Sequence, residues 1–226
     1  MDAPDVDAAT LADSLRFIRR VNALLGYTRA TISHLDGFSR RWQPGQRITM
    51  IDFATGSADV PLTIVGWARR RGFDVRIVGL DLHETTCALA RAATRAEPWI
   101  EIVRGDALDP PFDAGSFDYA LSSMFLHHLS DDDAARVLSA MGRVARRGIV
   151  AADLLRRARA YAWISLLTLL SNPVVRHDAR VSVAQAFSEA EALQLRSRAG
   201  VEFARFYRHF AHRFVLAGEK AHITAG

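Results

Sequence analysis

Residues 51–57 read Ile51-Asp52-Phe53-Ala54-Thr55-Gly56-Ser57, an apolar run that ends in a carboxylate and passes into a turn of small residues. The run begins at Ile48, and its length and apolar character are typical of a buried strand in a parallel sheet. A helix is expected from about Asp59, because Pro61 suits the first helical turn and apolar residues follow on one face. A strand that turns directly into a helix is the repeating unit of α/β folds.

The alternation of strands and helices continues to about residue 153. Strands separated by helical segments in this way form a parallel sheet that helices cover on both faces. The clearest helix signal is at Ser130, a candidate N-cap with Asp133 three residues later. The predicted strands cover residues 48–53, 75–81, 100–106, 117–122 and 148–153.

The two flanks of this region differ from it. We expect an N-terminal helical lid over residues 1–45, because apolar residues recur there at helical spacing. Residues 46–226 are predicted to form the main domain, with an apolar helical insertion at about 155–180. Segments 201–210 and 213–219 are strand-like and almost contiguous, so we expect an antiparallel pair. The prediction is a three-layer, doubly wound α/β fold whose seven-stranded sheet is mostly parallel and has an antiparallel C-terminal edge pair.

Composition narrows the class of protein. Half of the 226 residues are hydrophobic and 24% are charged, which fits a globular domain and excludes global disorder. The net charge of +4 comes from scattered arginine pairs and triplets, typical of solvated helix faces and not of a nucleic-acid surface. The single cysteine, Cys87, excludes a disulfide within the chain. We expect a cytoplasmic protein without a membrane span, because the longest apolar stretch is shorter than the ~20 residues a bilayer requires.

Carboxylates stand at the ends of three predicted strands, at Asp52, Asp81 and Asp106. In open α/β sheets, ligands bind outside these strand ends, and a carboxylate there needs a partner. The two oxygens of Asp81 match the vicinal diol of a ribose. Asp106 is placed to accept a hydrogen bond from an adenine amino group.

The turn after the first strand resembles a glycine fingerprint in which Ala54 and Ala58 replace glycines. Phosphate-binding turns offer the N-terminus of a helix to the phosphate, but Asp59 stands at that position here. Its charge repels phosphate and suits an ammonium group. The turn therefore argues against NAD and favours a phosphate-free, zwitterionic nucleoside such as S-adenosylmethionine.

Five motifs follow one another in order: residues 51–57, 79–81, 105–107, 117–120 and the run Phe125-Leu126-His127-His128-Leu129. Together they resemble the motifs of class I S-adenosylmethionine-dependent methyltransferases, especially the ubiquinone/menaquinone-biosynthesis type and related small-molecule methyltransferases. The resemblance covers about residues 46–155. It implies S-adenosyl-L-methionine as the cofactor.

The resemblance also implies the cofactor-binding residues. The first turn approaches the methionine part, the residue after the second strand holds the ribose, and the third and fourth strand ends flank the adenine and the rest of the cofactor. Ala54 and Ala58 depart from the family pattern, so we expect a slightly shifted backbone. The implied residues are Asp52, Ala54, Thr55, Gly56, Ser57, Asp59, Asp81, Leu82, Asp106, Ala107, Ser122 and Ser123.

Three residues are candidates for catalysis: His127, His128 and Asp153. An oxygen acceptor needs a base when it must lose a proton, and histidine titrates near neutral pH. The combination of two adjacent histidines with this aspartate resembles that of certain sugar O-methyltransferases of this family. The alternative is that one histidine packs near the helix that starts at Ser130. No metal site is predicted, because no ligand cluster of useful spacing is present.

We expect the acceptor to be a small hydrophobic or aromatic molecule, a phenolic, polyketide-like or glycosidic natural product methylated on oxygen. Phe17, Tyr27, Tyr161 and Trp163 are the expected lining of its pocket. C-methylation of a quinol-type ring, methylation of RNA or protein, and an inactive S-adenosylmethionine-binding module are the alternatives. The favoured hypothesis predicts no nucleic-acid partner. It is compatible with a homodimer.

Overall fold

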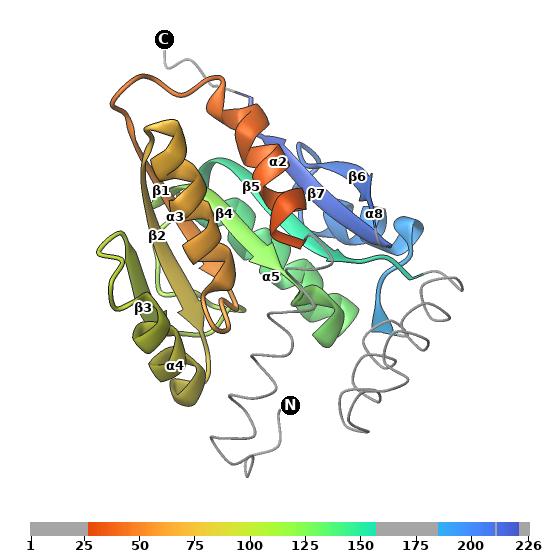
Figure 1. Ribbon diagram of the computed structural model, residues 1–226. Helices are drawn as coiled ribbons and strands as arrows, with labels where there is room; N and C mark the ends of the chain where they lie inside the picture. The colour runs from red at the N-terminus through yellow and green to blue at the C-terminus, as the bar shows by residue number, and fades with distance from the viewer. Residues whose placement is uncertain (1–26, 157–184, 211, 222–226) are drawn as a thin grey trace.

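The computed structural model describes residues 27–156, 185–210 and 212–221, except for the side chain of Tyr27 (Figure 1). Strands and helices alternate through this part of the chain, as the apolar pattern predicts. The elements are α2 (Tyr27–Ser39), β1 (Arg47–Phe53), α3 (Asp59–Arg71), β2 (Asp74–Asp81), α4 (Glu84–Thr94), β3 (Ile100–Arg104), β4 (Phe117–Ser123), η1 (Leu126–His128), α5 (Asp131–Val144), β5 (Ala145–Leu154), α8 (Glu189–Arg198), β6 (Arg205–His209) and β7 (Arg213–Glu219).

Seven strands form one sheet in the order β3-β2-β1-β4-β5-β7-β6. Strands β1 to β5 run parallel, and β7 is antiparallel to both of its neighbours, β5 and β6. The predicted doubly wound, mostly parallel sheet is confirmed. The strand order reverses between β1 and β4, and ligands of open α/β sheets bind at the carboxyl ends of the strands at such a point.

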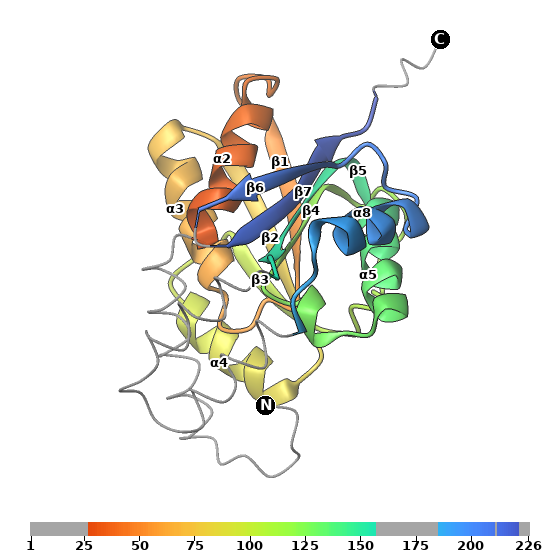
Figure 2. The ribbon, with the colours of Figure 1, turned by 90° about the vertical axis from the view of Figure 1, so that its right-hand side faces the viewer.

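Helices cover both faces of the sheet (Figure 2). Helices α2, α3 and α4 lie on one face, where their apolar side chains join those of β1 and β2 in one buried cluster. Helices α5 and α8 lie on the other face and form the second cluster with β4, β5 and β7. Helix α5 begins where the sequence predicts, because the Ser130 hydroxyl accepts a hydrogen bond from the Asp133 backbone N–H.

Two boundaries differ from the sequence prediction. Strand β3 ends at Arg104, so Asp106 lies in the loop beyond it and not on the strand. Strand β5 begins at Ala145, directly after α5, so Gly148 lies inside the strand. A Cβ atom at Gly148 would lie 2.4 Å from the backbone oxygen of Gly218. Gly148 therefore permits the close approach of β5 and β7, where we expected a helix stop.

The predicted lid is only partly within the described residues. Helix α2 packs on the sheet and buries Leu35 and Phe38, and Trp42, just beyond its end, is buried in the same cluster. Residues 1–26 and 157–184 lie outside the described part, so the lid and the helical insertion stay predictions. So do the roles given to Phe17, Tyr27, Tyr161 and Trp163. Among the helices that are described, none is long and apolar enough to cross a membrane.

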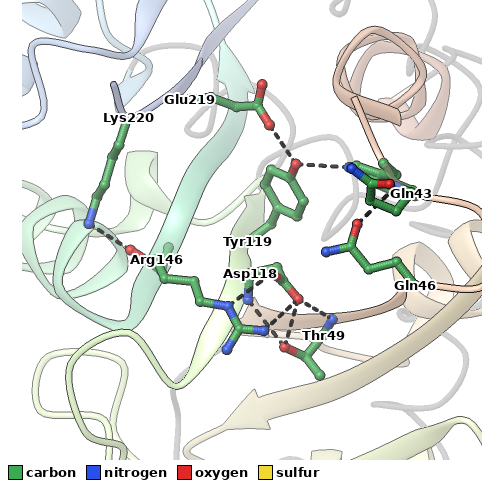
Figure 3. A network of polar contacts seen from close by, with 10 residues as sticks. Gln43, Gln46, Thr49, Asp118, Tyr119, Arg146, Glu219 and Lys220 are labelled. Atoms are coloured by element: carbon green, nitrogen blue, oxygen red, sulfur yellow. Dashed lines mark hydrogen bonds and ion pairs between the residues drawn. The ribbon is translucent and has the colours of Figure 1, made fainter. Parts of the chain in front are cut away.

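A network of polar contacts connects the start of β4 with its neighbouring strands (Figure 3). The buried Asp118 carboxylate accepts two hydrogen bonds from the Arg146 guanidinium, both at 2.9 Å, and a third from the Thr49 backbone N–H. Next to it, the Tyr119 hydroxyl accepts from Trp42 Nε1 at 2.9 Å and donates to Glu219. The network lies at the amino end of β4, away from the carboxyl ends of the strands where ligands of this fold bind. We therefore assign it to the support of the fold.

Candidate functional site at the carboxyl ends of the strands

The turn between β1 and α3 has an unusual backbone. Ala54, Gly56 and Ala58 have φ angles of 54°, 56° and 61°, all in the left-handed region. Glycine reaches this region freely, but each alanine there costs roughly 1–2 kcal/mol. The turn is held by the Thr55 N–H, which donates to the Leu80 oxygen at 3.0 Å. The two alanines thus adopt left-handed backbone angles, which glycine would adopt at lower cost.

Asp52 lies beneath this turn and is only 2% exposed. Its Oδ2 accepts a hydrogen bond from the Thr55 hydroxyl at 2.8 Å, while its Oδ1 has no partner in the described part of the chain. Burial raises the pKa of Asp52 to about 7, and the nearby Asp81 and Asp59 carboxylates add to the shift. A Cβ at Gly79 would lie 2.8 Å from Thr55 Oγ1, so glycine at this position leaves room for the Thr55 side chain.

Asp81 connects the ends of β1 and β2. Its Oδ2 accepts from the Gly56 N–H at 3.0 Å, and its Oδ1 accepts from the His83 N–H at 3.1 Å. Burial raises the pKa of this carboxyl group, although both backbone donors oppose the shift. Leu82, the next residue, is 50% exposed and offers an apolar surface beside the carboxylate. The pair suits a nucleoside, whose sugar needs acceptors and whose base needs an apolar contact.

The other predicted cofactor residues lie in the β1–α3 turn and at or just beyond the ends of β3 and β4. The exposed Asp106 accepts from the Leu108 N–H at 2.8 Å, and Ala107 beside it is buried. The Ser57 hydroxyl donates to Asp59 Oδ2 at 2.9 Å. Ser122 and Ser123 end β4, and the buried Ser122 Oγ has no partner among the described residues.

These residues fit a cationic nucleoside better than a phosphate ligand. The β1–α3 turn and the strand ends beside it carry Asp52, Asp59 and Asp81, which attract cations. The unpartnered oxygens of Asp52 and Ser122 add buried acceptors at the same edge of the sheet. S-adenosylmethionine carries a sulfonium, an ammonium and a ribose diol, so its groups match this donor and acceptor set.

On the other side of β4, η1 places His127 against Asp153 of β5. The His127 Nδ1 lies 2.6 Å from Asp153 Oδ1, and the His127 backbone N–H donates to Oδ2 at 3.1 Å. The Leu154 N–H donates to the same carboxylate. Both side chains are buried, with 1% and 0% exposure. Asp153 therefore fixes the orientation of the imidazole ring.

His128 differs from its neighbour. It is exposed, and its ring centroid lies 4.1 Å from that of His127. The structure thus brings together all three residues that we expected at the acceptor side. It separates a buried His127–Asp153 pair from an exposed His128, which adjacency in the sequence does not reveal.

Two contacts of α2 were not predicted. The Thr31 hydroxyl lies 3.5 Å from the Ser123 hydroxyl at the end of β4. One turn later, His34 Nε2 lies 3.0 Å from His209 Nε2 of β6. No spacing rule connects residues 175 positions apart, so only the fold reveals this pair. Within the described ranges, no group of three or more His, Cys, Asp or Glu residues is placed to hold a metal ion.

Comparison with known proteins agrees with this geometry. Residues 51–152 match a family model described as "Methyltransferase domain". A demethylmenaquinone methyltransferase of Staphylococcus carnosus is 31% identical over 98 residues, which are 43% of this chain and 39% of the relative. The chain thus matches about two fifths of that relative's length.

Solved structures share the fold over most of the chain. An S-adenosylmethionine-dependent methyltransferase from Aquifex aeolicus superposes with a TM-score of 0.67 at 15% identity, covering 95% of this chain and 99% of that one. Magnesium protoporphyrin IX methyltransferase from Synechocystis, solved with S-adenosylhomocysteine, gives a TM-score of 0.60 at 13% identity, with coverage of 97% and 90%.

The sheet order, the acidic strand ends and these matches together support a class I S-adenosylmethionine-dependent methyltransferase. The match to the methyltransferase-domain family runs from the end of β1 into β5.

Proposed function

We propose that this chain transfers a methyl group from S-adenosylmethionine to an oxygen of a small hydrophobic or aromatic acceptor, a phenolic, polyketide-like or glycosidic natural product. His127 acts as the base and Asp153 orients it. The observation that carries the proposal is the 2.6 Å contact between His127 Nδ1 and Asp153 Oδ1 beside the strand ends.

The cofactor residues have separate tasks in this proposal. Asp81 holds the ribose hydroxyls, the first turn contacts the methionine part, and Asp106 with Ala107 flanks the adenine. Asp52 and Asp59 place negative charge beside the cationic groups. When bound, S-adenosylmethionine supplies a methyl group on a positively charged sulfur, and this sulfur leaves as a neutral thioether.

The base follows from the hydrogen bonds of Asp153. Two backbone N–H groups donate to this carboxylate, so it acts as an acceptor, and we assign the proton between the two side chains to His127 Nδ1. The Nε2 atom of a neutral imidazole is then the acceptor, as in other His–Asp pairs. An acceptor hydroxyl gives its proton to Nε2 as its oxygen becomes nucleophilic. A positioned base of this kind contributes roughly 10²–10⁴-fold to a rate.

The burial of His127 sets a condition on the acceptor. Its side chain is 1% exposed, so the acceptor has to displace a covering group before it reaches Nε2. The His128 ring is the neighbouring group at the exposed side. An apolar acceptor that enters in this way excludes water from the reacting oxygen.

A second candidate is C-methylation of a quinol-type ring. The curated relative's name, demethylmenaquinone methyltransferase, favours it. An electron-rich ring carbon needs less help from a base than a hydroxyl does. In that case the His127–Asp153 pair serves to hold η1 against β5.

The test is a screen of phenols, polyketides, glycosides and demethylated quinols with S-adenosylmethionine, read by mass spectrometry for the gain of one methyl. Active acceptors are then compared between the wild type, His127→Gln and His128→Gln. O-methylation that is lost in His127→Gln supports the proposal. A C-methylated ring formed at an unchanged rate by His127→Gln favours the second candidate, and no methylated product with any acceptor contradicts both.

A further inference from the structure

Asp52 is the most enclosed of the carboxylates around the proposed cofactor site. It is 2% exposed, against 9% for Asp81, and Asp59 is partly exposed. In the sheet it lies between Gly79 of β2 and Leu121 of β4, which offer no polar side chain. Its one side-chain donor is the Thr55 hydroxyl, and its Oδ1 is unpartnered within the described residues. A carboxylate in such a place lacks the solvation that its charge needs.

The charges around Asp52 add to this cost. Asp81 lies at the end of the neighbouring strand β2, and Asp59 lies at the start of α3. Both are carboxylates, so each one opposes the ionisation of Asp52 and raises its pKa. His83 acts on Asp81 and opposes the burial effect there. Among the described residues, the charged groups that act on Asp52 itself are therefore both carboxylates.

We propose that Asp52 is protonated in the free protein and loses its proton to solvent when the cationic cofactor binds, so that cofactor binding is coupled to proton release. The inference rests on the proposed binding of S-adenosylmethionine. The sulfonium and ammonium groups bring positive charge into a site with three carboxylates. They supply the countercharge that the ionised form of Asp52 lacks in the free protein.

This coupling gives the site a definite pH dependence. The free-state pKa of Asp52 is about 7. Below this value the cofactor has to displace a proton, so its apparent affinity falls as the pH falls. For a complete coupling, the dissociation constant is about tenfold larger at pH 6 than at pH 8. Cofactor loading is thus favoured at neutral and alkaline pH.

The experiment is isothermal titration of the full chain with S-adenosylmethionine near pH 6.5, in phosphate and in imidazole buffer. The two buffers differ in the heat that they take up with a proton, so the difference in binding heat counts the protons released. We expect roughly half to one proton per bound cofactor, from a group with a pKa near 7.

Two variants assign the proton. Asp52→Asn keeps the shape and a hydrogen-bond acceptor for Thr55 but cannot ionise, so its proton release is absent and its affinity no longer changes between pH 6 and pH 8. The matched control Asp113→Asn removes an exposed carboxylate between β3 and β4 and keeps the wild-type proton count.

The outcomes separate this inference from the proposed function. Binding of S-adenosylmethionine without net proton release overturns the coupling and leaves the proposed function standing. Proton release that persists in Asp52→Asn also overturns it and moves the titrating group to another residue. The absence of cofactor binding in the wild type overturns the proposed function, and this inference with it.

Discussion

The imidazole of His127 and the carboxylate of Asp153 meet at 2.6 Å, although η1 and β5 bring them from positions 26 residues apart. The same carboxylate also accepts the backbone N–H of His127. Two contacts to one group fix both the place and the rotation of the ring. A side chain held in this way is suited to proton transfer, which depends on orientation.

The first prediction concerns the base itself. His127→Gln lowers kcat for an oxygen acceptor by roughly 10²–10⁴-fold, because Gln cannot take the proton. Affinity for S-adenosylmethionine stays within about twofold, because His127 lies on the other side of β4 from Asp52 and Asp81. Steady-state kinetics and calorimetry measure the two quantities. An unchanged kcat removes His127 from the chemistry.

The second prediction concerns the orienting group. Asp153→Asn keeps the shape but allows the amide to face His127 as a donor, which favours the wrong tautomer. We expect kcat to fall by about 10²-fold or more, with the pH–rate profile displaced from that of the wild type. A purely structural role for Asp153 lowers thermal stability but leaves the profile of the remaining activity in place.

The strand ends illustrate what the sequence predicts well. The apolar run from Ile48, the turn after Asp52 and the capped helix after Ser130 each depend on neighbours along the chain. Such local signals place the parallel strands and hence the edge at which Asp52 and Asp81 meet. By contrast, the sequence could not show that β3 ends before Asp106, because the end depends on its pairing with β2.

The third prediction concerns the network at the opposite end of β4. Asp118→Asn leaves the Arg146 guanidinium without its charged partner, and Arg146 is 52% exposed, which moderates the cost. We expect a loss of about 2–3 kcal/mol in the free energy of unfolding, or about 5–10 °C in Tm. Cofactor affinity is unchanged.

The control for this variant is Asp113→Asn, which changes an exposed carboxylate and alters stability by less than about 0.5 kcal/mol. Thermal melting followed by circular dichroism measures both variants. An Asp118→Asn protein that melts with the wild type contradicts the structural role of the network.

The fourth prediction concerns the His34–His209 contact between α2 and β6. Burial, with a smaller effect from His209, lowers the pKa of His34 from 6.5 to about 4. Between these values the unfolded chain binds more protons than the folded chain, so stability falls as the pH falls from about 6.5 to about 4.

His34→Gln removes this proton uptake and flattens the decline. After an allowance for solvent screening of a partly exposed group, we expect an effect of about 1 kcal/mol, or roughly 2–4 °C in Tm at the acid end. Melting curves over this pH range test it, with the exposed His83→Gln as the matched control. Equal slopes in the wild type and His34→Gln remove His34 as the cause.

The candidate site could be predicted only in part, for a physical reason. Residues that we propose to contact the cofactor next to a strand end are encoded by local motifs, as Gly56 and Asp81 are. Burial is a property of the assembled molecule, so the sequence did not separate His127 from His128. The pKa of Asp52 also depends on two carboxylates from other elements.

The most direct test of the central claim is calorimetric titration of S-adenosylmethionine into the wild type and Asp81→Ala. Asp81 contributes the carboxylate at the end of β2, and hydrogen bonds to a charged group are worth about 1.5–3 kcal/mol. We predict saturable binding to the wild type and an affinity about 10- to 100-fold lower for Asp81→Ala. A wild-type protein that does not bind S-adenosylmethionine, or an Asp81→Ala protein that binds it equally well, contradicts the account.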